Sequence, residues 1–423
     1  MTAECTARIV TRFNRMGNDK REFTLQFPNF TLSVALSIGY TAYLSSRPKV
    51  ICPFFEIRCT LAIFVRRSGF WSLGASGTTS KDIKRVHVKR LGNSELEISP
   101  IGIGTWAMGG GGWEFSSGPQ NDNDSLCAIH AALDHGINWI DTAAVYGLGH
   151  AEDIVGRAVK GRTPRPYVFS KCSVVWDGKG KTTNCLRAVS IRRELEDSLR
   201  RLNTDVIDLY QIHWPQPDED IEEGWREMAK LKSEGKVRYI GVSNFNVKQM
   251  ARAQRIAQIT SLQPPYSILS RRIESEVLPF AQQNSIGVIS YAPLHSGLLT
   301  GALSAEAIAN LSPDDFRRGI RDFREPRLSH NLRVAETLRA IGDRHGHTVS
   351  EVAAAWVLRN PAITGTIIGV RTAQEVQEVV GAVEFRLSDA EIKEIEAVSK
   401  RSFWQRALLR GKEFWAETIS REP

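Results

Sequence analysis

The chain has 423 residues, more than one hydrophobic core usually organises unless the fold is a barrel of alternating strands and helices. Hydrophobic residues make up 42% and charged residues 24%, which is typical of soluble globular proteins and excludes a globally disordered chain. The formal net charge is +8, but many basic residues precede Leu91 and others stand beside acids, as in 191–197. Such mixed charge is typical of solvated helix faces, so we expect no nucleic-acid binding.

Cysteines are few for this length, six in all, and none stands in a C-x-x-C or other metal-ligand spacing. We therefore predict that the protein has no metal site. The same cysteine usage fits a reducing, cytoplasmic setting better than an oxidising one.

The first 84 residues differ from the rest. The stretch 23–46 has no charged residue, but Pro28 and Gly39 interrupt it and it is rich in Ser and Thr, so it is a poor membrane span. The later apolar runs 50–55 and 60–65 show no clear helical or strand period. We expect residues 1–84 to be a weakly ordered extension or upstream sequence read in by a wrongly assigned start. A signal anchor is the alternative, which mass spectrometry of the native N-terminus would test.

From Val86 onward, short apolar runs alternate with amphipathic stretches, which indicates repeated β-α units and a parallel sheet. The predicted strands are Ile101–Gly104, Trp139–Asp141, Tyr167–Ser170, Val206–Ile212, Tyr239–Val242, Ser261–Gln263, Gly287–Tyr291 and Gly365–Ile368. The predicted helices include Ser125–Leu133, Ala188–Leu202, Ile221–Glu234, Glu274–Asn284, Asn331–His345 and Val349–Arg359.

Eight such units favour an α/β fold of the closed (β/α)8 TIM-barrel kind, because closure removes the exposed edges of a sheet. The barrel should span 85–400, followed by a C-terminal tail at 401–423. Ahead of its first strand, 90–98 reads as a small hairpin that turns at 92–94 and plugs the bottom of the barrel.

Three titratable residues follow predicted strands: Asp141, Lys171 and His213. Tyr146 lies in the loop after Asp141, so all four should meet at the mouth where the strands end. Taken singly, each of these four residues could have a purely structural role. Together they suit proton transfer to a carbonyl oxygen: a lysine ammonium would bring a tyrosine closer to its working pKa, an aspartate would hold the lysine, and a neutral histidine would orient the carbonyl.

The segments that carry these residues resemble the aldo-keto reductase family, and they occur in the family's order between Val86 and Ser399. They are 141–156 (DTAAVYGLGHAEDIVG), 170–171 (SK), 209–215 (LYQIHWP), 235–245 (GKVRYIGVSNF) and 291–301 (YAPLHSGLLTG). The resemblance implies reduction of an aldehyde or ketone to an alcohol by hydride transfer from NAD(P)H, with Tyr146 as proton donor and Asp141, Lys171 and His213 completing the catalytic set.

The resemblance also implies a nicotinamide cofactor that lies across the barrel mouth without a Rossmann domain. Ser243, Asn244 and Gln263 would bind the carboxamide, Tyr291 would stack under the ring, and Thr105, Trp106 and Asp141 would lie near it. The loop Leu294–Leu299, with Ser296 and Gly297, would wrap the pyrophosphate. Gly369 and Arg371 would meet the adenosine 2′-phosphate.

Two residues depart from the family pattern: Glu375 stands where Gln or Arg is common at the adenosine end, and Val379 where Asn is common. Arg371 favours NADP(H), and the departures leave NAD(H) open. The sequence Gly102-x-Gly104-x-x-Ala107 mimics a dinucleotide fingerprint, but a glycine run rather than a helix follows it, so we reject a Rossmann site.

The substrate is expected to be a small carbonyl compound or sugar, with Trp106 and Trp214 in its pocket. Two alternatives stay open: a sugar or alcohol dehydrogenase working in the oxidative direction, and a binding module like the potassium-channel β subunits of the same family. No membrane partner is expected, and the sequence does not give the oligomeric state.

Overall fold

The structure is a computed structural model, and it describes residues 87–312 and 315–400 together with four strands nearer the N-terminus. The chain divides into two compact units, Met1–Asp82 and Ile83–Pro423. In the first unit β1 (Arg15–Met16), β2 (Lys20–Phe27), β3 (Phe30–Ile38) and β4 (Cys59–Arg66) form an antiparallel sheet in that order.

Strand β4 covers the apolar run 60–65, in which the sequence shows no strand period. The other predictions about 1–84 and the tail 401–423 concern mostly residues outside the described ones, and they stay predictions. No helix among the described residues has the length and apolar character needed to cross a membrane.

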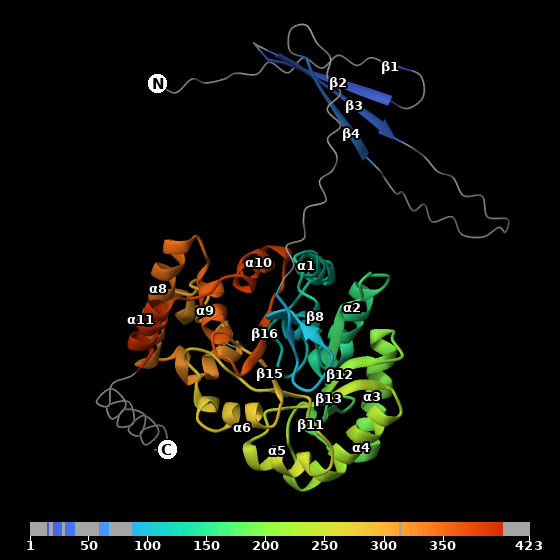
Figure 1. Cartoon of the computed structure of the whole chain (residues 1–423), viewed down its shortest axis with the longest axis vertical. Coiled ribbons are helices and arrows are strands. Elements are labelled where there is room, and N and C mark those ends of the chain that lie inside the picture. Colours follow the sequence, from blue (N-terminus) through green and yellow to red (C-terminus); the bar gives the residue numbers. More distant parts are fainter. Residues whose placement is uncertain are drawn as a thin grey trace, which may run out of the picture. The chain divides into compact units, whose positions relative to one another are not determined.

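In the second unit, eight parallel strands close into a barrel, confirming the predicted fold (Figure 1). They are β7 (Ile101–Gly104), β8 (Trp139–Asp141), β9 (Tyr167–Cys172), β12 (Ile207–Ile212), β13 (Val237–Ser243), β14 (Ser261–Gln263), β15 (Gly287–Ser290) and β16 (Ile363–Gly369). The ring closes where β16 pairs with β7, for example Thr366 with Ile101. All eight predicted strands are present; β7, β8 and β14 have the predicted bounds, and the other five differ at one or both ends.

Helices follow the strands and surround the barrel (Figure 1). They are α1 (Asp122–Asp134), α2 (His150–Val159), α3 (Ala188–Leu202), α4 (Ile221–Ser233), α5 (Val247–Gln254), α6 (Val277–Gln283), α7 (Ala305–Ala309), α8 (Arg327–His345), α9 (Val349–Leu358), α10 (Ala373–Gln377) and α11 (Asp389–Ser399). Capping boxes start α5, α9 and α11, where Asn, Thr or Ser precedes Gln or Glu by three residues. Helix α6 starts later than predicted, because 272–274 forms a separate 3-10 turn.

The predicted plug is also present. Strands β5 (Lys89–Arg90) and β6 (Glu97–Ile98) pair antiparallel, and the chain turns at Gly92, whose positive φ of 53° suits glycine. Leu91, Leu96 and Ile98 are fully buried. They pack against inward-facing side chains of the barrel strands, namely Trp139, Phe169, Leu209, Ile289 and Ile367.

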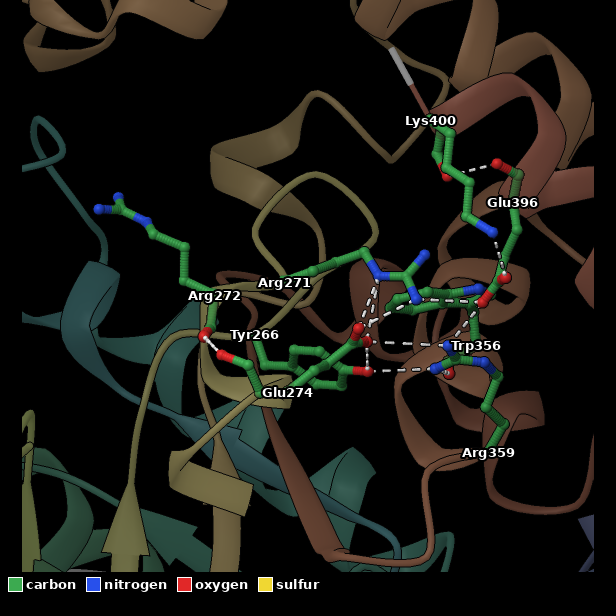
Figure 2. A network of polar contacts seen from close by, with 10 residues as sticks. Tyr266, Arg271, Arg272, Glu274, Trp356, Arg359, Glu396 and Lys400 are labelled. Atoms are coloured by element: carbon green, nitrogen blue, oxygen red, sulfur yellow. Dashed lines mark hydrogen bonds and ion pairs between the residues drawn. The ribbon is translucent and has the colours of Figure 1, made fainter. Parts of the chain in front are cut away.

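A polar network holds α11 against the barrel (Figure 2). Arg271 and Arg359 both bind the carboxylate of Glu396 on α11, at 3.1 and 3.0 Å. Their guanidinium carbons lie 5.0 and 3.6 Å from the ring centre of Trp356 on α9, so the cations also contact an aromatic face. Glu274 joins the network by accepting hydrogen bonds from Tyr266 and Arg271. The last described helix is therefore tied to both α9 and the loop after β14.

Candidate active site

Lys171 is at the centre of the polar cluster at the barrel mouth. Its Nζ lies 2.5 Å from Oδ1 of Asp141, 2.9 Å from the carbonyl oxygen of Thr142 and 3.3 Å from the hydroxyl of Tyr146. Asp141 ends β8 and Lys171 lies near the end of the neighbouring β9, so the parallel register brings them together. Tyr146 reaches the lysine from the 3-10 turn η2 (Tyr146–Gly149) that follows β8.

Burial and charge act in opposite directions on these groups. Lys171 is 1% exposed; burial favours its neutral form, but Asp141 and Tyr146 together outweigh burial and raise the pKa of Lys171. The sequence predicts that the Lys171 ammonium lowers the pKa of Tyr146; the ammonium acts in that direction, but burial outweighs it and raises the pKa of Tyr146. Tyr146 is therefore protonated at neutral pH, as a proton donor must be.

His213 follows β12 and meets the other side of Tyr146. The two ring centres are 5.7 Å apart and the rings are nearly perpendicular. Burial lowers the pKa of His213 well below its usual value, and the nearby Lys171 adds to that shift. The imidazole is therefore neutral and can form a hydrogen bond to a carbonyl group without carrying charge. The structure thus brings the four predicted catalytic residues together.

The residues predicted to bind the carboxamide form a connected set beside this cluster. Gln263 donates from Nε2 to Oδ2 of Asp141 at 2.8 Å, and Ser243 donates to the carbonyl oxygen of Gln263 at 2.8 Å. Asn244 has a positive φ of 64° and donates to the carbonyl oxygen of His213 at 3.0 Å. Tyr291 donates its hydroxyl hydrogen to Oδ1 of Asn244 at 3.0 Å. Amide and hydroxyl groups at this place fit the carboxamide of a nicotinamide.

Thr105 and Trp106 lie on the β7 side of the same mouth. The backbone N–H and the hydroxyl of Thr105 both donate to the carbonyl oxygen of Asp141, at 3.0 and 3.2 Å. Trp106 starts the 3-10 turn η1 (Trp106–Gly109). These contacts place the β7 loop against the end of β8.

The loop predicted to hold the pyrophosphate contains a tight turn after β15. It includes the 3-10 turn η5 (His295–Gly297), and Leu299 N–H donates to the carbonyl oxygen of Leu294 at 3.1 Å. Ser296 and Gly297 have positive φ values of 55° and 95°. Leu299 as a whole is fully buried and belongs to the hydrophobic core, so it presents no exposed atom to a ligand.

Arg371, predicted to meet the 2′-phosphate, lies just after Gly369 at the end of β16. Its Nε donates to Oε1 of Gln120 at 2.7 Å, and its Nη2 donates to the carbonyl oxygen of Pro119. Glu375 accepts a hydrogen bond from the Arg371 backbone N–H at 2.7 Å and lies in the first turn of α10. The carboxylate that departs from the family pattern thus stabilises the Arg371 turn, and Val379 is buried in the core.

Aromatic side chains surround the mouth. Trp214 is 40% exposed and stacks on His213 with ring centres 6.3 Å apart. Trp106 meets Phe316 edge-on at 5.3 Å, and Trp113 lies 6.3 Å from Tyr146. Sequence reasoning missed Phe316, because its loop between β15 and β16 has no periodic pattern. It also missed the hairpin of β10 (Val174–Trp176) and β11 (Thr182–Asn184) that follows β9.

Among the residues that the structure describes, no group of three His, Cys, Asp or Glu side chains could hold a metal ion. The mouth instead contains the buried ammonium of Lys171, with the phenol of Tyr146 next to it and the neutral imidazole of His213 beside the phenol. Such a set can protonate or orient an oxygen that gains negative charge.

The sequence matches a family model described as "Aldo/keto reductase family" over residues 100–400. Among curated proteins, the chain is 36% identical to aldo-keto reductase YhdN from Bacillus subtilis over 311 residues, covering 73% of this chain and 92% of the relative. It is 34% identical over 316 residues to the NADH-specific methylglyoxal reductase of Escherichia coli, covering 71% of this chain and 94% of that relative.

Solved structures give the same result. The glycerol dehydrogenase from Gluconobacter oxydans is 35% identical, with a TM-score of 0.69 and coverage of 74% of this chain and 95% of that chain. An aldo-keto reductase from Bacillus halodurans, solved in its holo form, is 26% identical, with a TM-score of 0.62 and coverage of 75% and 98%. The two curated relatives, an aldo-keto reductase and a methylglyoxal reductase, support carbonyl reduction, and the two alternatives left open by the sequence are not favoured. The chain belongs to the aldo-keto reductase family and is an oxidoreductase that reduces carbonyl groups with NAD(P)H.

Proposed function

We propose that Tyr146 protonates the carbonyl oxygen of an aldehyde or ketone in this reaction, with Lys171, Asp141 and His213 in supporting roles. The observation that carries the proposal is the position of Lys171 Nζ, which lies 2.5 Å from Asp141 and 3.3 Å from the Tyr146 hydroxyl. The bound nicotinamide cofactor supplies the hydride. As the Tyr146 proton leaves, the ammonium stabilises the developing tyrosinate, and the neutral imidazole of His213 keeps the carbonyl oxygen in place.

Trp106 and Trp214, joined by Trp113 and Phe316, are proposed to form the wall of the substrate pocket. Their faces are apolar, which suits a small carbonyl compound with an apolar flank and suits polar sugars less well. The test is a panel of aldehydes, ketones and sugars assayed with NADPH and NADH by loss of the reduced cofactor's absorbance. We expect turnover with apolar aldehydes and ketones, and absence of turnover across the panel would contradict the proposal.

NADP(H) is proposed as the preferred cofactor, because Arg371 offers a guanidinium group at the predicted 2′-phosphate position. The Escherichia coli relative is named as NADH-specific, so a preference for NADH occurs among the relatives. Arg371→Ala should raise the Kd for NADPH by roughly 10- to 100-fold, as expected for losing a hydrogen bond to a charged group, and should leave the Kd for NADH nearly unchanged. Quenching of tryptophan fluorescence measures both constants.

The control is Arg200→Ala on α3, an exposed arginine that pairs with Asp197. It should change neither constant. Equal weakening of NADPH and NADH by Arg371→Ala would mean that the arginine only supports the loop, and the NADP(H) preference would then be wrong. A cytoplasmic setting is proposed from the cysteine usage; Cys127, Cys172 and Cys185 are free thiols.

A further inference from the structure

A buried carboxylate lies behind the active site and takes no part in the proposed chemistry. Glu194 of α3 is 5% exposed. Its Oε2 accepts a hydrogen bond from the backbone N–H of Ser173 at 2.9 Å, and its Oε1 accepts one from the hydroxyl of Ser190 at 3.1 Å. Ser173 is two residues past Lys171 and has a positive φ of 79°, a conformation that serine rarely adopts. The carboxylate therefore holds a strained turn next to the catalytic lysine.

The Ser173 turn connects three parts of the mouth. Its hydroxyl accepts a hydrogen bond from the backbone N–H of Trp214 at 3.2 Å and lies 3.3 Å from the carbonyl oxygen of Trp214. One residue earlier, the carbonyl oxygen of Cys172 accepts from the N–H of His213 at 3.0 Å. The carbonyl oxygen of Ser173 accepts from Cys185 N–H, just after β11, at 3.0 Å. A shift of this turn would move Lys171, the His213–Trp214 pair and the β10–β11 hairpin relative to one another.

We propose that Glu194 is a positioning residue whose ionised carboxylate holds the Ser173 turn and thereby sets His213 and Trp214 against the bound carbonyl substrate. The inference rests on the proposed roles of His213 and Trp214. Glu194 itself touches neither of them.

The surroundings of Glu194 make its charge sensitive to pH. None of its contacts among the described residues is an ion pair; the nearby Arg193 on α3 acts at longer range. The Cys172 thiol of β9 and the Tyr210 hydroxyl of β12 lie near its charge, and their own pKa values are raised well above the usual range. Glu152 of α2, also near Tyr210, is paired with Arg201.

Burial raises the pKa of Glu194 to about 7, although the hydrogen bonds from Ser190 and Ser173 oppose the rise. Above that pH the group is a carboxylate and holds the Ser173 N–H by a charge-assisted bond. Below it the group is neutral, and the bond weakens.

Glu194→Gln is the test, because a glutamine keeps the shape and the acceptor oxygen but never ionises. We expect the wild-type KM for a carbonyl substrate to rise by roughly fivefold as the pH falls from about 8 to about 6, the difference between a charged and a neutral hydrogen bond. In the variant, KM should have the higher value at both pH values. The KM for NADPH should not follow this pattern. A variant that keeps the wild-type pH profile and KM would overturn the proposal.

A second measurement does not need a substrate. Tryptophan fluorescence of the wild type should show a step near pH 7, assigned to Trp214 by its loss in Trp214→Phe, and Glu194→Gln should lose that step. The matched control is Glu196→Gln on the same helix, which removes a surface pair with Lys236 and should keep the step. If the step persists in Glu194→Gln, the proposal is wrong even if carbonyl reduction is confirmed. If the step is lost but no carbonyl turns over, the proposed function fails and the positioning contact stands.

Discussion

Tyr146→Phe should lower kcat for carbonyl reduction by roughly 100- to 10,000-fold, the range in which a positioned general acid contributes. The variant loses the hydroxyl placed 3.3 Å from Lys171 Nζ, and with it the proposed proton donor. The phenyl ring should keep its packing against Trp113 and His213, since those contacts use the ring face and edge. Steady-state kinetics with NADPH and a carbonyl substrate measures the effect, and fluorescence titration checks that the cofactor Kd is unchanged.

Tyr167→Phe is the control for this substitution. Tyr167 starts β9, at the end of the strand opposite to Lys171, and its ring contacts the side chains around the plug. Its loss of a hydroxyl should leave kcat within about twofold of the wild type, in line with the small effects of substitutions away from a site. A Tyr146→Phe enzyme that works at the parental rate would show that the proton comes from elsewhere.

Lys171→Met should reduce the free energy of unfolding by about 3–5 kcal/mol, because it leaves the Asp141 carboxylate buried without its cation. Asp141 is 2% exposed, and of its partners only the amide of Gln263 at 2.8 Å would remain as a side-chain donor at a normal distance. Urea unfolding monitored by fluorescence measures the change. Activity should also fall steeply, since the ammonium next to Tyr146 is gone.

The double variant Asp141→Asn with Lys171→Met separates the loss of stability from the loss of activity. It removes both charges, so most of the lost stability should return, while activity should stay low. If the single and double variants are equally unstable, the loss comes from packing rather than from the unpaired charge.

The pH dependence of the same pair has a definite sign. The raised pKa of Lys171 means that its stabilising contribution is fully present below the unfolded-state lysine pKa and is lost as the pH rises through the folded pKa. Burial raises the pKa of Asp141 although Lys171 opposes the rise, so in Lys171→Met, where that opposition is gone, stability should likewise fall as the pH rises above the ordinary aspartate range.

The barrel and its catalytic residues were predictable because they depend on local patterns. A strand that ends in a titratable residue can be recognised from the sequence. The carboxyl ends of the parallel strands lie together at the barrel mouth, and this does not depend on the conformation of the loops. Asp141, Lys171 and His213 were placed by that argument, and Tyr146 by its position in the loop after Asp141. The plug hairpin was also predictable from a local pattern, since the run Gly92-Asn93-Ser94 is typical of a turn.

Other features depend on contacts between segments far apart in the sequence. In the sequence, Glu194 is one of several acidic residues in a charged helix. Only the packing of α3 against β9 brings its carboxylate to the Ser173 N–H, from which it accepts a hydrogen bond. Phe316 comes from a loop without pattern yet meets Trp106, 210 positions earlier in the chain. Glu375 departs from a family pattern, and its bond to the Arg371 backbone becomes visible only in the fold.

The buried plug has a consequence for the order of events during turnover. Leu91, Leu96 and Ile98 fill the floor of the barrel, so in the described part of the chain the mouth is the route by which reactants enter and leave. Tyr291 and Asn244, which are proposed to meet the nicotinamide, belong to the same mouth as the aromatic wall. Direct hydride transfer needs the cofactor and the carbonyl compound in this mouth at the same time, so we expect a sequential rather than a ping-pong kinetic pattern.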